Sequence, residues 1–201
     1  MAPGTENELL ARMRTGDEEA FLLLYRKLHG PIYRFVLNLT NSQSVAEDVT
    51  QDVFLALIRE DCGFDAGRGT LSAYLFGVAR KLVLRHLERN RTLGEQEIPK
   101  EEWAATAFSV NADPVTDLLH TEGIEALRKA IVSLPKRYRE VVALCDLEEM
   151  DYSQAATLLG CPVGTVRSRL HRARGLLLEK LQPKRDPKAA VRGLDPARSL
   201  T

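Results

Sequence analysis

The feature that most constrains the fold is a stretch near residue 160 in which two amphipathic segments meet at a tight turn. The pattern predicts a short helix over 153–159 that ends at Gly160, a turn over 161–164, and a second helix capped by Thr165. Gly160 can adopt the left-handed backbone that a sharp turn needs, and the small Ala156 allows two helices to approach closely. This arrangement is typical of a helix-turn-helix.

The second helix of this motif has one apolar side and one basic side. Val166, Leu170, Ala173 and Leu177 recur at helical spacing and are expected to be buried. Exposed arginines are common on solvated helices, but here the turn before them favours a DNA-binding face, because arginine reads guanine and anchors phosphates in the major groove. We predict Arg167 and Arg172 as the readers. The predicted DNA contacts of this helix are Thr165, Arg167, Ser168, Arg169, His171, Arg172 and Arg174.

Composition favours helices in the rest of the chain as well. The 201 residues are 44% hydrophobic but only 6% aromatic, and Leu, Ala, Arg and Glu outnumber the residues that favour sheets. We therefore expect an all-α fold. No apolar run approaches the roughly 18 residues that cross a bilayer, and the N-terminus lacks a signal-peptide pattern, which predicts a cytoplasmic protein without membrane insertion.

The formal net charge is zero, but the charges are distributed unevenly. Residues 80–91 and 152–182 each hold five basic side chains and one acid, whereas residues 92–125 hold eight acids and one base. We predict two small helical domains joined by an acidic linker. The expected boundaries are a first domain over 1–91, a flexible linker over 92–120, a helix-turn-helix domain over 121–182, and a disordered tail over 183–201.

Helical spacing and turn residues place the remaining elements. Helices are predicted over 8–13, 18–29 and 32–39, from Ser44 onward, and over 70–89, 124–133 and 138–147. Gly30 and Pro31 are expected to end the second of these, and Ser44 with Glu47 forms a capping-box pattern. On the helix over 70–89, Leu71, Leu75, Val78, Leu82 and Leu87 are expected to face the core, opposite Arg80, Lys81, Arg85 and Arg89.

The sequence contains no recognisable catalytic or metal-binding pattern. The cysteines Cys62, Cys145 and Cys161 are far apart and form no C-x-x-C pair, and the glycine-rich loop over 62–69 lacks the phosphate-binding G-x-x-x-x-G-K pattern. We therefore predict that the protein is not an enzyme and uses no metal or cofactor.

Three stretches resemble a known family. AEDVTQDVFLAL, LSAYLFGVARKLVLRHLERN and LPKRYREVVALCDLEEMDYSQAATLLGCPVGTVRSRLHRAR resemble the signatures of the extracytoplasmic-function (ECF) sigma factors, a branch of the sigma-70 family that retains only conserved regions 2 and 4. The resemblance covers most of residues 18–180. It implies an alternative sigma factor that binds core RNA polymerase, recognises and melts promoter DNA, starts transcription, and is controlled by an anti-sigma factor.

The resemblance also implies roles for particular residues. The region 2 domain would dock on the clamp helices of the polymerase β′ subunit through Glu47, Asp48, Gln51 and Asp52. It would bind the minus-ten element through Arg68, Tyr74, Arg80, Lys81 and Arg85, while the region 4 domain binds the minus-thirty-five element and the β flap. The sequence departs from the family at Tyr74, where Trp is common, at Gly77, where a larger side chain is common, and at His171, where some relatives carry an aromatic ring. We expect Tyr74 and Phe76 to serve core packing more than base stacking.

Other interpretations remain open at this point. The linker could thread the RNA channel of the polymerase or act only as a solubilising spacer, and its Trp103 and Phe108 are expected to pack on a domain or a partner. A free-standing regulator would use the same helix-turn-helix to bind a palindromic operator as a dimer. A small helical enzyme would need a polar constellation that the sequence does not reveal.

Overall fold

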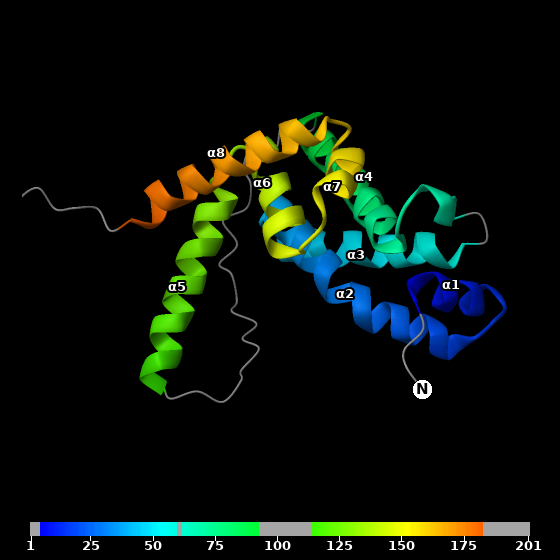
Figure 1. Cartoon of the computed structure of the whole chain (residues 1–201). Helices are drawn as coiled ribbons and strands as arrows, with labels where there is room; N and C mark the ends of the chain where they lie inside the picture. Colours follow the sequence, from blue (N-terminus) through cyan, green and yellow to red (C-terminus); the bar gives the residue numbers. More distant parts are fainter. Residues whose placement is uncertain (1–4, 60–61, 93–113, 183–201) are drawn as a thin grey trace, which may run out of the picture.

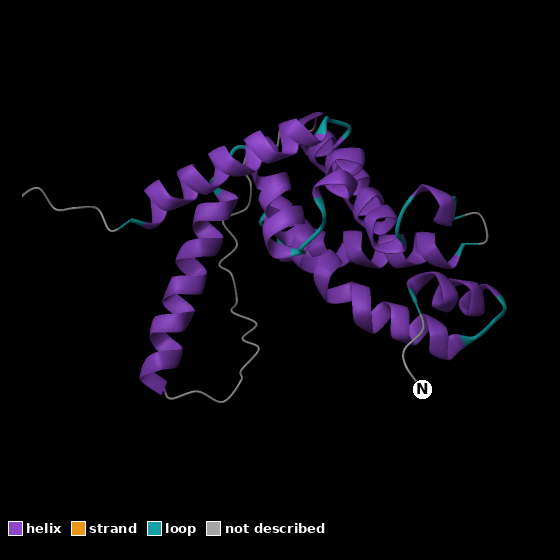
Figure 2. Cartoon of the chain, viewed as in Figure 1, coloured by secondary structure: helices purple, strands orange, loops and turns teal. Residues whose placement is uncertain are grey.

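The computed structural model describes residues 5–59, 62–92 and 114–182, and every regular element within these ranges is helical, so the all-α prediction is confirmed (Figure 2). The N-terminal half, residues 5–92, contains α1 (Glu6–Arg14), α2 (Glu18–Thr40), α3 (Gln43–Ile58), the 3-10 turn η1 (Ala66–Arg68) and α4 (Leu71–Thr92). The C-terminal half, residues 114–182, contains α5 (Pro114–Val132), α6 (Lys136–Val142), the π-helical turn η2 (Ala143–Leu147), α7 (Tyr152–Leu159) and α8 (Val163–Leu181).

Helix α2 runs through Pro31 without interruption, so the predicted helix end near Gly30 is wrong. Proline removes one backbone hydrogen bond and normally weakens a helix interior. The apolar side of α2 continues beyond it, however, and Ile32 and Phe35 are completely buried. Burial of this side offsets the lost hydrogen bond, and the helix ends only at Asn41, whose backbone is left-handed.

Two predicted helix starts are wrong by a few residues. The cap of α3 is Ser42, whose hydroxyl accepts a backbone hydrogen bond, whereas Ser44 lies inside the first turn. Helix α8 begins at Val163 after Pro162, so Thr165 lies within the helix and does not cap it. In both cases an extended residue upstream already starts the helix, and the side-chain pattern alone does not distinguish it from the next polar residue.

The region predicted as the linker, 92–120, is described only at residue 92, the end of α4, and from residue 114 onward. Helix α5 begins at Pro114, well before the predicted start at residue 124. Proline is favourable in a first helical turn, because its missing amide donor is not needed there. Trp103, Phe108 and the tail over 183–201 lie outside the described residues.

Helices α1 to α4 form a bundle around an apolar core. Phe35 of α2 meets Phe76 of α4 edge-on, with 5.2 Å between the ring centroids. On α4, Leu71 and Leu75 are buried as predicted, and the expected packing of Phe76 is confirmed. The other predicted core residues of this helix, Val78, Leu82 and Leu87, are only partly buried.

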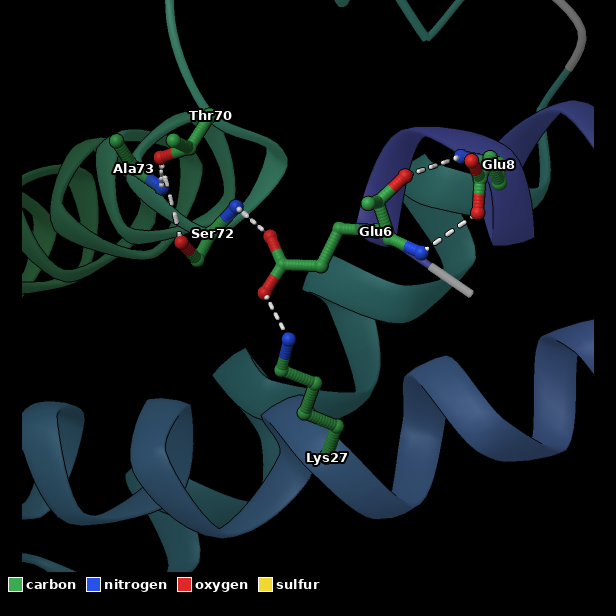
Figure 3. A network of polar contacts seen from close by, with 7 residues as sticks. Glu6, Glu8, Lys27, Thr70, Ser72 and Ala73 are labelled. Carbon is green, nitrogen blue, oxygen red and sulfur yellow. Dashed lines mark hydrogen bonds and ion pairs between the residues drawn. The ribbon is translucent and has the colours of Figure 1, made fainter. Parts of the chain in front are cut away.

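Glu6 fixes the start of α4 relative to α1 and α2 (Figure 3). Its carboxylate accepts a hydrogen bond from the Ser72 amide at 3.1 Å and pairs with Lys27 Nζ of α2 at 2.8 Å. Beside it, Thr70 Oγ1 accepts a hydrogen bond from the Ala73 amide at 3.2 Å. A carboxylate at a helix N-terminus satisfies a free amide and interacts favourably with the helix dipole. The loop that precedes α4 is therefore anchored at its C-terminal end.

In the C-terminal half, α8 packs against α5, α6 and α7. Its predicted apolar stripe, Val166, Leu170, Ala173 and Leu177, is buried as expected. Where a single helix was predicted over 138–147, α6 widens into the π-helical turn η2. Such turns insert one extra residue into a helix and redirect the side chains that follow.

The two halves pack against each other. Helix α4 contacts α7, and α2 contacts α5, α6 and η2, so that α8 lies across one end of the assembly (Figure 1). Buried side chains from both halves belong to one connected core. Among the described helices, none combines the length and the apolar character that a bilayer-crossing segment requires.

Candidate nucleic-acid interface

The turn of the helix-turn-helix has the geometry that the sequence predicts. Gly160 is left-handed, with φ of 64° and ψ of 40°, and ends α7. Ala156 and Val166 are both buried at the junction of α7 and α8. Asp151 caps α7 by accepting hydrogen bonds at 2.9 Å from two backbone amides. These local features fix the direction of α8 relative to α7.

The polar side of α8 carries the predicted DNA contacts. Arg167, Ser168, His171, Arg172 and Arg174 are exposed. Two further predicted contacts, Thr165 and Arg169, are half-buried, and Arg169 lies beside the thiol of Cys161. The exposed residues form a basic face on a rigid helix, a shape that fits a major groove.

Arg174 is paired inside the protein. Its guanidinium donates two hydrogen bonds to Asp146 of η2, at 2.5 Å and 3.1 Å, and this contact raises the pKa of Arg174. The side chain is still 55% exposed. Arg174 therefore joins α8 to η2 and also contributes charge to the basic face.

The two predicted readers lie beside aromatic rings. The nearby Arg172 guanidinium lowers the pKa of the Tyr138 phenol. Arg137 lies over the same ring, 4.8 Å from its centroid. Arg167 lies 5.9 Å from the centroid of the Tyr152 ring. Such neighbours restrict the conformations of both arginines while leaving them exposed to a ligand.

A second polar surface lies where the loop before α4 meets α7. A groove of about 570 Å³ brings together three of the predicted minus-ten residues, Arg68, Tyr74 and Lys81. Tyr74 is half-buried, 5.6 Å from the ring centroid of Phe64, and its hydroxyl donates a hydrogen bond to a loop carbonyl. A Cβ added at Gly77 would meet nothing within 4 Å, so the groove is open beside this residue.

The other two predicted minus-ten residues point elsewhere. Arg85 lines a smaller groove of about 370 Å³ together with Lys81 and Asp52 of α3. Arg80 faces the C-terminal half, where its Nε donates a hydrogen bond to Glu140 Oε1 of α6 at 2.9 Å. Arg80 is therefore bound to a carboxylate of the other half.

The four residues predicted to dock on a partner are exposed on α3: Glu47, Asp48, Gln51 and Asp52. Glu47 and Gln51 line a groove of about 760 Å³ between α2 and α3. This groove has an aromatic side that the sequence reasoning missed, although Phe21, Tyr25, His29 and Tyr33 stand four residues apart on α2. Burial in this cluster raises the pKa of Tyr33. An acidic rim beside apolar surface suits a basic, partly apolar helical partner.

Two further polar contacts cross between the halves. Arg34 of α2 forms a bidentate pair with Glu148 at 3.1 Å and 3.2 Å, and burial raises the pKa of Glu148 against the opposing effect of Arg34. Arg139 of α6 donates to the carbonyls of Leu39 and Leu134, each at 3.0 Å, and burial lowers the pKa of Arg139. No sequence signal identifies the contacts of Arg34 with Glu148 and of Arg139 with Leu39, because the partners are 114 and 100 positions apart in the chain.

Two family models match the chain. The model described as Sigma-70 region 2 matches residues 24–92, and the model described as Sigma-70, region 4 matches residues 124–177. The first match covers most of α2 and all of α3 and α4, and the second covers α7, the turn and most of α8.

Several named proteins are similar to most of this chain. The chain is 31% identical to the ECF RNA polymerase sigma factor SigE of Mycolicibacterium smegmatis, covering 83% of this chain and 65% of that relative. It is 29% identical to the RNA polymerase sigma-H factor of Pseudomonas aeruginosa, covering 89% of this chain and 94% of the relative. The chain thus spans slightly less than two thirds of the first protein and nearly all of the second.

Solved structures resemble the fold. The sigma factor RpoE of Bartonella quintana, crystallised with the anti-sigma factor NepR, is 26% identical and superposes with a TM-score of 0.64 over 82% of this chain and 98% of that one. CnrH, in complex with the cytosolic domain of CnrY, is 24% identical with a TM-score of 0.61 over 87% of this chain and 95% of that one. The second likeness concerns the fold alone.

Proposed function

Because the chain belongs to the extracytoplasmic-function branch of the sigma-70 family, we propose that it is an alternative sigma factor. It binds core RNA polymerase and directs promoter recognition, DNA melting and transcription initiation, while the polymerase performs the catalysis. The observation that carries this proposal is the joint match of regions 2 and 4 around an exposed arginine face on α8. The domain division over 1–91, 92–120, 121–182 and 183–201 is part of the same proposal.

Region 4 reads the minus-thirty-five element through α8. Arg167 and Arg172 contact base edges, because both are exposed and restricted by aromatic neighbours. Arg174 anchors a phosphate from its fixed position, and the half-buried Arg169 supports the helix from its side. The remaining contacts in this proposal are Thr165, Ser168 and His171, and the same domain binds the β flap.

Region 2 holds the melted minus-ten strand in the groove before α4. Arg68 and Lys81 supply positive charge to the backbone. Tyr74 packs partly on the core beside Phe64, as expected, and the part of its ring that lines the groove remains available to a base. Arg85 extends the basic track into the neighbouring groove. Arg80 completes this set only when it is released from Glu140.

Core polymerase docks on α3 and on the groove beside it. Glu47, Asp48, Gln51 and Asp52 present acids to a basic surface, and the apolar wall includes Leu55 and Ile58, which are 48% and 53% exposed. Such a pair of features matches a partner helix with basic and apolar sides, as expected for the β′ clamp helices.

An anti-sigma factor keeps the protein inactive until it is needed. The support is the solved structure of RpoE in complex with the anti-sigma factor NepR, because RpoE shares the fold of this chain over most of its length.

We also place the protein in the cytoplasm, because its proposed partners, polymerase and promoter DNA, are there. No cofactor or metal takes part in this function.

The docking surface provides the most direct test of the proposal. Asp52→Arg reverses an exposed charge on α3, and we expect at least about tenfold weaker binding to core polymerase, since opposed charges at an interface are costly. Glu19→Arg makes the same change on an exposed position of α2 and is expected to bind normally. Fluorescence anisotropy of the labelled protein with purified core measures both. Equal affinity of Asp52→Arg and the unchanged protein would remove α3 from the interface.

A further inference from the structure

The ion pair between Arg80 and Glu140 joins the two halves, and Arg80 is the neighbour in sequence of Lys81, which lines the proposed minus-ten groove. The guanidinium of Arg80, however, points to α6. The Glu140 side chain is only 6% exposed and that of Arg80 is 25% exposed. A buried carboxylate is unfavourable without its partner, so the pair forms only while the halves stay packed.

The C-terminal half also closes the groove itself. Ser153, Gln154, Thr157 and Leu158 of α7 line the same groove as Tyr74 on the opposite wall. A single strand whose bases stack on Tyr74 and whose backbone follows Lys81 needs an open track. In the packed arrangement, the first helix of the helix-turn-helix occupies one side of that track.

Carboxylate and phosphate compete for the same arginine. Both accept charge-assisted hydrogen bonds from a guanidinium, and Arg80 Nε already donates to Glu140 at 2.9 Å. The bidentate pair of Arg34 with the buried Glu148 stabilises the same packing at a separate point of the interface. The groove and Arg80 are thus withdrawn from DNA together.

We propose that Glu140 is an internal competitor of promoter DNA, which holds the free protein in a closed state by pairing with Arg80. This inference rests on the proposed function, because it concerns the same minus-ten groove. Single-stranded DNA binds only after the halves separate and Arg80 exchanges the carboxylate for a phosphate. Core polymerase would favour the separated state by binding both halves at distant points.

The test uses the full chain and a short, labelled, random-sequence single-stranded DNA as the probe. Glu140→Gln removes the competing charge with little change in shape, and Glu148→Gln weakens the packing at the other contact. Each variant should have a larger radius of gyration by small-angle X-ray scattering and should bind the probe about tenfold more tightly. The factor of about ten corresponds to an increase in the fraction of open molecules from roughly 10% to nearly all, because the apparent affinity is proportional to that fraction. Glu125→Gln, which removes an exposed pair with Lys129 outside the interface, should change neither.

If both variants fold and have an unchanged radius of gyration and an unchanged affinity for the DNA probe, the inference is wrong. If the radius increases but the DNA probe is not bound more tightly, Glu140 does not compete with DNA for Arg80. Circular dichroism verifies folding, and Glu148→Gln decides the question if Glu140→Gln fails to fold. The same titration with core polymerase separates this inference from the proposed function. The unchanged protein bound to core polymerase can start transcription even if the free variants have the same radius of gyration and the same DNA affinity as the free unchanged protein. That result would support the proposed function and refute the closed state.

Discussion

At the scale of single residues, several arginines have a partner inside the protein as well as a proposed partner in DNA. Arg174 is paired with Asp146 and Arg80 with Glu140, and Arg172 lies near the Tyr138 hydroxyl. A guanidinium has five donors, so one edge can be fixed by the protein while another remains for a ligand. Asp146 thus orients Arg174 before DNA arrives, whereas Glu140 withholds Arg80 from DNA.

Removing the guanidinium of Arg172 tests its proposed role as a reader. We expect Arg172→Ala to weaken binding to the minus-thirty-five element roughly ten- to a hundredfold, because one bidentate base contact contributes about 1–3 kcal/mol. Lys180→Ala removes one charge from the last turn of the same helix and controls for the loss of charge alone. The affinity of the holoenzyme for promoter DNA is measured by mobility shift. An equal loss in both variants would show that Arg172 contributes charge and not base contacts.

Cys145 lies half-buried in η2, and burial raises the pKa of its thiol to about 11, with a further contribution from Asp146. Only the thiolate reacts with iodoacetamide, so the folded protein should be alkylated at Cys145 roughly a hundredfold more slowly at pH 8 than the urea-unfolded chain. The rate in the folded protein should rise steadily up to pH 10. Peptide mass spectrometry follows this residue, and a rate at pH 8 equal to that in urea would contradict the environment described for Cys145.

At the scale of helices, side-chain periodicity predicts which faces are buried better than where helices begin and end. The stripe from Val166 to Leu177 follows directly from the sequence, because burial selects apolar side chains at every turn. The path of α2 through Pro31 does not, since tertiary packing of Ile32 and Phe35 overrides a local helix breaker. The π-helical turn η2 has no recognisable local pattern.

The start of α4 depends on an acid from another helix. Glu6→Ala removes the acceptor of the Ser72 amide and the partner of Lys27, and we expect the free energy of unfolding to fall by about 1–2 kcal/mol. Glu6→Gln keeps an acceptor for the amide and should lose less. Urea unfolding followed by circular dichroism measures both. If the two substitutions cost the same, the hydrogen bond to α4 is not the source of the stability.

At the scale of the whole molecule, the sequence predicts two helical units and their binding faces, but not how the units pack. The proposed contact residues can be found because DNA and polymerase require charged side chains at regular spacing on exposed faces. The contacts between the halves join residues about 60 to 114 positions apart, such as Arg80 with Glu140 and Arg34 with Glu148. Neither charge patterning nor periodicity relates positions at such separations, so only the folded chain reveals them.

The central claim, that this chain gives core polymerase its promoter specificity, is tested most directly by run-off transcription. Purified bacterial core polymerase is supplied with genomic promoter fragments, with and without the protein. We predict discrete transcripts that appear only when the protein is present and that start at a fixed distance downstream of a shared pair of sequence elements. If core polymerase starts nowhere specific with the protein present, while the protein alone binds a palindromic operator, the account is contradicted and the chain is a free-standing regulator.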